Sequence, residues 1–212
     1  MKGTTHLTIG VAIGAVAALY YPFTMANAAT YVAVAAFSAL SADLDGPSIL
    51  SSKLSTLSKL VYELLHWGGW LLLGAVIYLY FTDQYMNLTL SISSVVIILL
   101  GLVAKRGAIR NGLVSVIGAC LMYGGYTAGM NWLIGFGLFV AWVPWLKHRG
   151  MTHTVWAVMI WGMIGSGLEQ ELQLEGIMNV AVLGYLSHLV ADTLTPSGVK
   201  WLYPIYKKSI KL

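Results

Sequence analysis

The chain has 212 residues, of which 58% are hydrophobic and 9% are charged, and its formal net charge at pH 7 is +4. This composition excludes a soluble globule, because too little polar surface is available to cover one, and it indicates an integral membrane protein. The single cysteine, Cys120, excludes an intrachain disulfide and argues against a cysteine-based metal site. Since no Pro-, Gly- or Ser-rich linker separates the apolar stretches, we expect one integral-membrane domain over residues 1–212.

Eight apolar stretches are long enough, or nearly so, to cross a bilayer. They cover residues 7–23, 28–42, 61–81, 88–104, 112–128, 132–146, 154–168 and 177–194. The predicted fold is therefore all-α, a polytopic bundle of about eight transmembrane helices. Several stretches are shorter than the ~20 residues of a straight span, so we expect tilted helices or a locally thinned bilayer around them.

The basic residues fall on alternate connections between these stretches. All 12 Lys and Arg lie before the first stretch, between the second and third, the fourth and fifth or the sixth and seventh, or after the eighth. The positive-inside rule therefore predicts that both termini and the even-numbered connections are cytoplasmic. Because topology accounts for the basic charge, we expect no binding of nucleic acid. The acids of the opposite side are expected to be solvated loop charges: Asp83, Glu169, Glu171 and Glu175.

The two ends of the chain have distinct patterns. The last residues, GVKWLYPIYKKSIKL, mix aromatic side chains with lysines, which is typical of a segment at the cytoplasmic interface. The first stretch could alternatively be a signal peptide, with Lys2 before the apolar run and small residues around Asn27 for cleavage. We favour a retained first helix.

Seven ionisable residues lie at the predicted cytoplasmic ends of the helices. His188 and Asp192 are four residues apart, so both side chains project from one helix face. An ionisable residue inside a membrane segment is costly and indicates a functional site. Because histidines and acids gather at one end from distant segments, we predict a metal site. Its candidate ligands are His6, Asp43, Asp45, His148, His153, His188 and Asp192.

Local signals refine this set. Asp43 and Asp45 are two residues apart, so both can face one site only if the helix has already unwound at Leu44. Gly46 and Pro47 mark a helix stop there.

Three further residues near the predicted site have a local role. Thr152 is predicted to be the N-cap of the seventh helix, which would fix the position of His153. Glu63 and His66, in the first turns of the predicted third helix, form a nearby pair that could orient ligands or contact substrate.

Histidine nitrogen combined with carboxylate oxygen suits Zn²⁺, Mn²⁺ or Fe²⁺ better than Ca²⁺ or Mg²⁺. Seven ligands exceed the need of one tetrahedral ion, so we expect two divalent ions, Zn²⁺ or Mn²⁺, with a bridging aspartate and a metal-activated water as nucleophile. Arg149 and Lys147 are expected to stabilise charge on a phosphoryl group, and with Glu63 they are the candidate catalytic residues.

The motifs TTH, SADLD, HRGMTH and GYLSHLVADTLTPSG together resemble the YdjM-like membrane-bound metal-dependent hydrolases of bacteria, some of which are induced in the SOS response. The resemblance runs from about residue 5 to about residue 204, and the last two motifs are its specific part. It implies a polytopic inner-membrane protein with a hydrolase-type metal centre, and it carries over the same seven ligands. SADLD departs from the pattern, in which a proline precedes the first aspartate. The spacing of His188 and Asp192 is also similar to that of the zinc-dependent phospholipase C group.

We therefore expect a hydrolase of the bacterial inner (plasma) membrane whose active site faces the cytoplasm and whose substrate is a membrane lipid, a phospholipid or another lipid phosphate. Two alternatives are open. The first is a metal-ion or proton-coupled transporter, which is less favoured because a conduction path needs polar groups across the midplane. The second is a non-catalytic membrane protein in which metal ties helix ends together.

Overall fold

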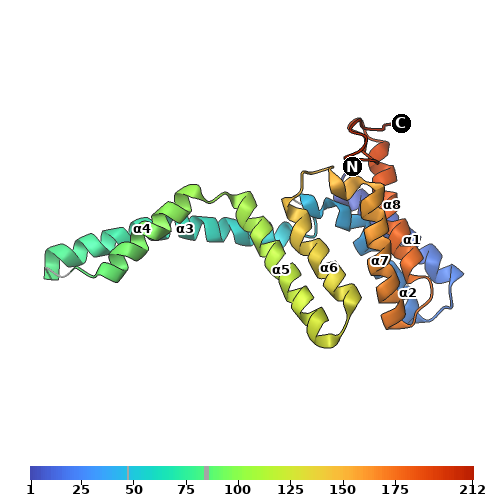
Figure 1. Ribbon diagram of the computed structural model, residues 1–212, viewed down its shortest axis with the longest axis horizontal. Helices are drawn as coiled ribbons and strands as arrows, with labels where there is room; N and C mark the ends of the chain where they lie inside the picture. Colours follow the sequence, from blue (N-terminus) through green and yellow to red (C-terminus); the bar gives the residue numbers. More distant parts are fainter. Residues whose placement is uncertain (47, 84–85) are drawn as a thin grey trace. The chain divides into compact units, whose positions relative to one another are not determined.

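The computed structural model describes the whole chain except residues 47, 84 and 85. It is all-α and 78% helical, and its described residues form eight α-helices and no strand (Figure 1). The predicted all-α class is confirmed. Pro47, which together with Gly46 forms the predicted helix stop, lies outside the described residues.

The chain divides into two compact units, Met1–Ser51 with Val114–Leu212, and Ser52–Leu113. The first unit holds α1 (Gly3–Tyr20), α2 (Met25–Ser41), α6 (Asn131–Trp142), α7 (Val155–Leu172) and α8 (Ile177–Thr193). The second unit holds α3 (Ser52–Asp83) packed against α4 (Leu88–Val103). Helix α5 (Arg106–Ala128) begins in the second unit and continues into the first.

Each predicted apolar stretch corresponds to one helix, but several helices are longer than predicted. Seven charged residues lie on helices rather than in the predicted connections: Lys53, Lys59, Asp83, Arg106, Arg110, Glu169 and Glu171. The prediction follows apolar runs alone, whereas Lys, Arg and Glu are good helix formers and extend a helix beyond its apolar part.

Fewer helices than predicted have the length and hydropathy of a membrane span. Among the described residues three qualify: Gly3–Tyr20, Met25–Asp45 and Ser52–Thr82. Helices α4 and α5, bent by 101° at their break, make a fourth candidate if they are one span. Helices α6 and α8 are apolar but have only 12 and 17 residues, less than the ~20 of a straight span. The described part of the chain therefore supports three or four candidate spans, not clearly eight.

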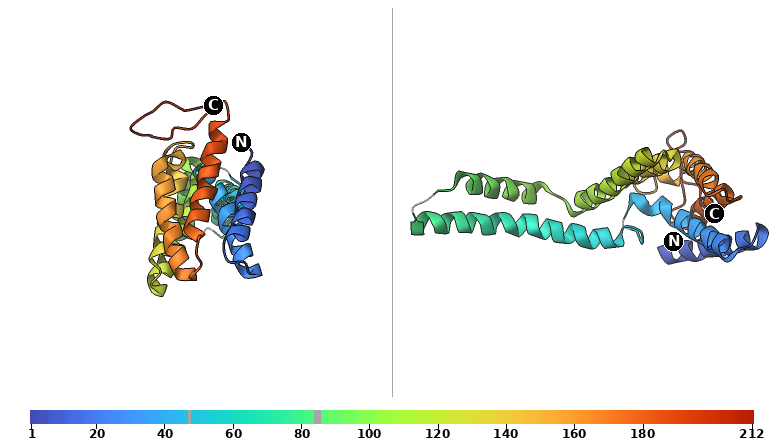
Figure 2. Two further views of the ribbon diagram at one scale, coloured as in Figure 1. Left: turned by 90° about the vertical axis from the view of Figure 1, so that its right-hand side faces the viewer. Right: turned by 90° about the horizontal axis from the view of Figure 1, so that it is seen from below.

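Helix α8 lies at the centre of the first unit, where it packs against α1, α2 and α7 (Figures 1 and 2). Glycines permit close contacts among these helices. A Cβ on Gly14 of α1 would lie 2.4 Å from Cα of Val32 in α2, and a Cβ on Gly184 of α8 would lie 2.6 Å from the carbonyl oxygen of Ala35. Small residues at such crossings let helix backbones approach closely. The ends of α1, α2 and α8 are thereby held together.

Short 3-10 turns continue or precede the helices at one end of this unit. Helix α2 continues as η1 (Ala42–Asp45), α6 continues as η2 (Val143–Trp145), and η3 (Met151–His153) precedes α7. Both termini lie at this end, since the Met1 amine is 2.5 Å from Asp192 Oδ1 and the Leu212 backbone N–H donates to the carbonyl of Thr193. Buried Tyr185 of α8 donates its hydroxyl proton to the carbonyl of Thr152 at 2.7 Å, which ties α8 to η3.

Candidate metal centre

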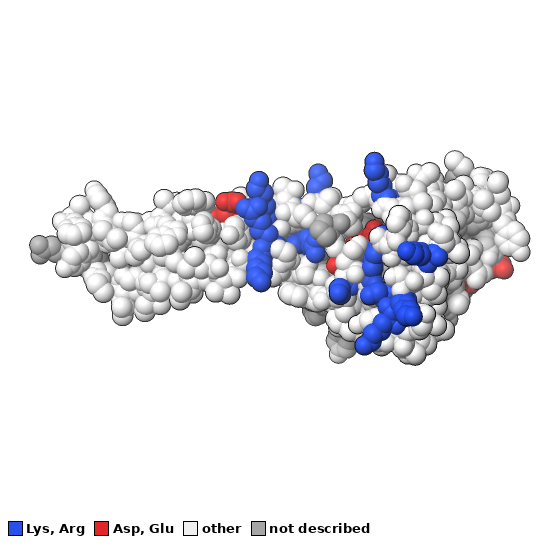
Figure 3. Space-filling model, turned by 90° about the horizontal axis from the view of Figure 1, so that it is seen from above, with Lys and Arg blue, Asp and Glu red and all other residues white. Residues whose placement is uncertain are grey.

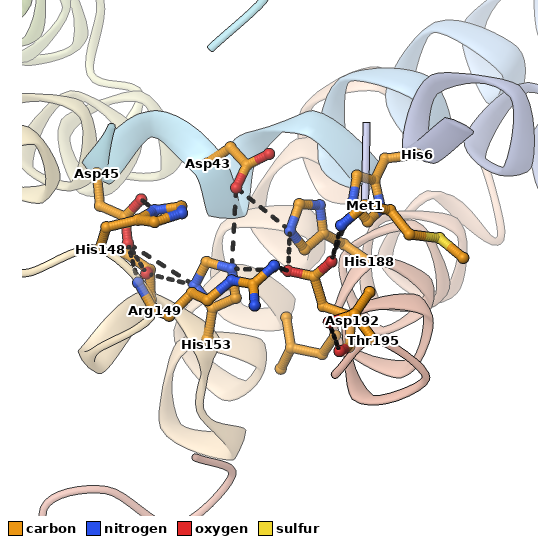
Figure 4. A network of polar contacts seen from close by, with 12 residues as sticks. Met1, His6, Asp43, Asp45, His148, Arg149, His153, His188, Asp192 and Thr195 are labelled. Atoms are coloured by element: carbon orange, nitrogen blue, oxygen red, sulfur yellow. Dashed lines mark hydrogen bonds and ion pairs between the residues drawn. The ribbon is translucent and has the colours of Figure 1, made fainter. Parts of the chain in front are cut away.

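The structure brings all seven predicted metal ligands together at this end of the first unit (Figure 4). They come from the first turns of α1, from η1, from the connection between α6 and α7, and from the last turns of α8: His6, Asp43, Asp45, His148, His153, His188 and Asp192. The 3-10 geometry of η1 is the unwinding that the two-residue spacing of the aspartates requires.

Three imidazoles face two carboxylates at the centre of the cluster. Nε2 of His6 lies 3.4 Å from Asp192 Oδ1. Nε2 of His188 lies 3.5 Å from Asp43 Oδ1 and 3.8 Å from Asp192 Oδ2, and Nε2 of His153 lies 3.9 and 3.7 Å from the same two oxygens. Most of these separations exceed those of hydrogen bonds. They are close to the roughly 3.4 Å that separates two ligands of one tetrahedral ion with bonds of about 2.1 Å.

The same imidazole nitrogens are buried without a hydrogen bond. Nε2 of His6, His153 and His188 has no hydrogen-bond partner among the described residues, and each of the three side chains is at most 1% exposed. An unpaired buried polar atom costs about 1–3 kcal/mol. Three of them aimed at carboxylates fit a divalent transition metal, because imidazole and carboxylate are ligands of Zn²⁺ and Mn²⁺.

Asp43 offers a link to a second group of ligand atoms. It forms one trio with His6 and His188 and another with Asp45 and His148, and within each trio the ligand atoms lie within 4.8 Å of one another. A carboxylate can bridge two ions. The donor set therefore fits one ion or a bridged pair.

Backbone carbonyl Ala39 O fixes the orientation of His188. Nδ1 of His188 lies 2.7 Å from this oxygen, which only accepts hydrogen bonds, so Nδ1 carries the proton. Nε2 is then free of a proton in the neutral ring. Metal-binding histidines are commonly oriented in this way through their second nitrogen.

A buried network surrounds Asp45, whose side chain is fully inaccessible. Oδ1 accepts from Nδ1 of His148 at 2.7 Å, and Oδ2 accepts from Thr152 Oγ1 at 2.6 Å and from the backbone N–H of Arg149 at 3.1 Å. Thr152 Oγ1 also lies 2.9 Å from Nδ1 of His153. Asp45 thus joins both histidines of the HRGMTH motif.

Arg149 connects this network to the centre. Its backbone has φ of +56°, a left-handed conformation that costs energy for a residue other than glycine and is found at functional sites. In this conformation the backbone N–H of Arg149 donates to Asp45 Oδ2, and its side-chain Nη2 lies 2.9 Å from Asp192 Oδ2. The guanidinium therefore lies beside a carboxylate of the candidate metal site.

A polar cavity of about 290 Å³ gives access to the cluster and is lined by Asp43, His148, Arg149 and Asp192, among others. The Asp43 side chain is 21% exposed, whereas that of Asp192 is 2% exposed. Solvent and small molecules therefore reach the site on the side of Asp43 and Arg149.

Basic side chains gather around this end of the first unit (Figure 3). Lys147 is exposed, and with Arg149 and Lys200 it lines a neighbouring cavity of about 180 Å³. The predicted role of Lys147 in binding a phosphoryl group stays a prediction.

The two histidines of the connection between α6 and α7 have opposite pKa shifts. The hydrogen bond with Asp45 raises the pKa of His148, against a smaller effect of burial. Burial lowers the pKa of His153 to about 4, because the charged imidazolium loses its hydration. His153 is therefore neutral at physiological pH, as a metal ligand must be.

The predicted capping role of Thr152 is wrong. Thr154 is the N-cap of α7, and its hydroxyl accepts from the backbone N–H of Ala157. The η3 turn inserts before α7 and shifts the helix start, which leaves the Thr152 hydroxyl free to bind Asp45. Sequence reasoning missed this contact, although a hydroxyl residue directly before a candidate ligand was visible in MTH.

Glu63 and His66 lie in the second unit, on α3. Because α3 begins at Ser52, they lie well inside the helix rather than in its first turns. Glu63 forms an ion pair with Arg106 at 2.8 Å, and the His66 ring stacks on Tyr62 with centroids 5.9 Å apart. The catalytic role of Glu63 stays a prediction.

The chain matches the family model of the YdjM inner membrane protein over residues 1–212, its whole length. The resemblance inferred from the four motifs is thus confirmed. No curated protein and no solved structure matches the chain.

Proposed function

Because this chain belongs to the YdjM inner membrane protein family and has a cluster of histidines and aspartates that could hold metal, we propose that it is a membrane-bound metal-dependent hydrolase. Its substrate would be a phosphoester of a phospholipid or of another lipid phosphate. The observation that carries the proposal is the set of three unpaired Nε2 atoms that face two carboxylates at 3.4 to 3.9 Å.

The residues that would hold metal are the three imidazoles and the carboxylates of Asp43 and Asp192, together with His148 and Asp45. Zn²⁺ and Mn²⁺ are the ions that fit these donors. When bound, such an ion supplies Lewis-acid polarisation of the phosphoryl group and an activated water.

The other residues of the cavity would bind and orient the substrate. The guanidinium of Arg149 is a bidentate donor that matches a phosphoryl group, and Lys147 and Lys200 lie in the neighbouring cavity. The His148 side chain is 54% exposed and donates Nδ1–H to Asp45, so Nε2 is the nitrogen that remains available to an ion.

A lipid substrate is favoured by the position of the site. The ligands lie at the ends of apolar helices, at the same end of the unit as the C-terminal segment, whose Leu212 N–H donates to the carbonyl of Thr193. We propose that this end faces the cytoplasm in a multi-pass arrangement, since the positive-inside rule assigns basic residues to that side. The cavity would then lie at the depth of lipid headgroups.

The test uses full-length protein in detergent, stripped with a chelator and reloaded with Mn²⁺ or Zn²⁺. Phosphatidic acid in mixed micelles and a soluble aryl phosphate are the probes, and the readout is released phosphate or alcohol. We expect metal-dependent turnover that His188→Ala abolishes. Asn179→Ala, an exposed polar residue at the other end of α8, is the control and should retain it.

The alternatives give different results. Stoichiometric metal without turnover of either probe would identify a non-catalytic metal protein. Metal or proton flux into proteoliposomes, lost in His188→Ala, would identify a transporter. Turnover that persists in His188→Ala would remove this cluster from the reaction.

A further inference from the structure

The hydroxyl of Thr152 lies between a buried carboxylate and a buried imidazole. Thr152 Oγ1 is 2.6 Å from Asp45 Oδ2 and 2.9 Å from His153 Nδ1. Thr152 is 1% exposed, and the side chains of Asp45 and His153 are fully buried. Water is therefore excluded from both hydrogen bonds, and the three groups must satisfy one another.

The direction of both hydrogen bonds follows from counting protons. Asp45 also faces Nδ1 of His148 and the backbone N–H of Arg149, and a carboxylate surrounded by donors is ionised and only accepts. The single hydroxyl proton of Thr152 must then point to Asp45. The hydroxyl oxygen is left as an acceptor, so Nδ1 of His153 must carry a proton.

This proton assignment determines what His153 presents to the metal site. A neutral imidazole carries one proton, so Nδ1–H leaves a lone pair on Nε2. That atom lies 3.7 Å from Asp192 Oδ2 and 3.9 Å from Asp43 Oδ1, in the space shared with His188.

We propose that Thr152 is a positioning residue, which relays the charge of Asp45 to His153 and keeps His153 in the Nδ1–H tautomer that can bind metal through Nε2. In this role Asp45 acts through Thr152 rather than as a direct ligand of the ion that His153 binds. The inference rests on the proposed metal binding of the site, but the tautomer itself exists without metal.

Loss of the hydroxyl should favour the opposite tautomer. Without Thr152 Oγ1, an Nδ1 proton would have no acceptor at hydrogen-bond distance and one carboxylate oxygen within 4 Å, Oδ2 of Asp45 at 3.7 Å. A proton on Nε2 has two carboxylate oxygens at 3.7 and 3.9 Å, so the balance between the tautomers should shift toward Nε2. A protonated Nε2 cannot coordinate a metal. His188 has no such sensitivity, because its acceptor is the backbone carbonyl of Ala39.

The experiment compares Thr152→Val, Thr152→Ser and Thr154→Val with the wild type. Valine has the shape of threonine without the hydroxyl, and serine restores it. Thr154 is the matched control, since its buried hydroxyl in the same loop binds Met151 O and caps α7 but touches neither Asp45 nor His153. Thr154→Val therefore reproduces the loss of stability without the loss of the relay.

The first readout is the ¹⁵N spectrum of the imidazoles in the metal-free protein at about pH 8, above the usual histidine pKa. The resonances of His153 are assigned by their loss in His153→Asn. We expect a protonated Nδ1 and an unprotonated Nε2 in the wild type, in Thr152→Ser and in Thr154→Val. In Thr152→Val we expect the reverse, an unprotonated Nδ1 and a protonated Nε2.

The second readout is the affinity for Zn²⁺ or Mn²⁺ by competition with a chelating dye. We expect Thr152→Val to weaken binding by about 10–100-fold, the usual effect of removing a group that orients a ligand, and the other two variants to remain near the wild type. A wild-type His153 that carries its proton on Nε2, or a Thr152→Val variant with unchanged tautomer and affinity, would overturn the proposal. If the wild type bound no metal, the proposed function would fail. The ¹⁵N spectra alone would still show whether Thr152 determines the tautomer of His153.

Discussion

Replacement of Arg149 by glutamine should destabilise the metal-free protein more than the metal-loaded one. Nη2 of Arg149 lies 2.9 Å from Oδ2 of Asp192, and the two side chains are 25% and 2% exposed. At an effective dielectric constant of ~20, two unit charges at this distance attract by about 6 kcal/mol before desolvation is subtracted. Breaking a fully buried pair costs about 3–5 kcal/mol, and the partial exposure of Arg149 reduces the expected loss to about 2 kcal/mol.

The loss should be visible as a change in melting temperature. For a domain of this size, 1 kcal/mol corresponds to about 2–4 °C, so metal-free Arg149→Gln should melt about 4–8 °C below metal-free wild type. A bound divalent ion supplies the positive charge that Asp192 loses, so the difference should fall to less than half in the metal-loaded pair. Thermal unfolding in detergent, followed by tryptophan fluorescence with chelator or with added Zn²⁺, gives both differences.

Arg149→Lys is the matched control, because it keeps a cation near Asp192 but lacks the planar guanidinium. It should lose less stability than Arg149→Gln in the metal-free protein. If Arg149→Gln lowered the melting temperature equally with and without metal, or more with metal, the guanidinium and the ion would not neutralise the same carboxylate, and the reasoning would be refuted.

Three further predictions concern the site and its support. Asp192→Ala should purify without the metal that elemental analysis finds in the wild type, and stoichiometric metal in this variant would exclude Asp192 as a ligand. Metal affinity should rise with pH through the pKa of His148, because the proton and the ion compete for the ring. The hydrogen bond with Asp45 places this pKa above the ordinary histidine value. An equally steep dependence of metal affinity on pH in His148→Ala would contradict this. Gly184→Ala should lower the free energy of unfolding by about 1–3 kcal/mol, since its Cβ would lie 2.6 Å from a backbone oxygen of α2. Gly74→Ala, with no neighbouring atom within 4 Å, should raise it by up to about 1 kcal/mol. Chemical denaturation in detergent measures both changes.

The members of the candidate site could be predicted from the sequence because their chemistry is unusual for their surroundings. An imidazole or a carboxylate inside an apolar run is costly, so His188 and Asp192 stand out without any knowledge of their contacts. The role of Thr152 could not be predicted, because a hydroxyl before α7 is equally suited to capping. Its partner depends on the η3 turn, which shifts the start of the helix to Val155.

The existence of the helices was easier to predict than their lengths or their relation to the membrane. Each apolar run is a helix, but α3 begins at Ser52 because its polar first turns also favour helix. Hydropathy alone also predicts more spans than the helix lengths of the described residues support. Helix α6 ends at Trp142, where η2 takes over with Pro144 in its first turn, so an apolar run of adequate composition yields a helix of 12 residues.

The size of the polar cavity limits which inhibitors could occupy it. A volume of about 290 Å³ corresponds to about ten water molecules at ~30 Å³ each. A phosphonate or bisphosphonate fits within this space and could contact Arg149 and the metal ligands together, whereas a long alkyl tail would have to remain outside the cavity. Short, doubly charged compounds should therefore compete as well as their long-chain analogues, and most of the affinity should come from the charged head.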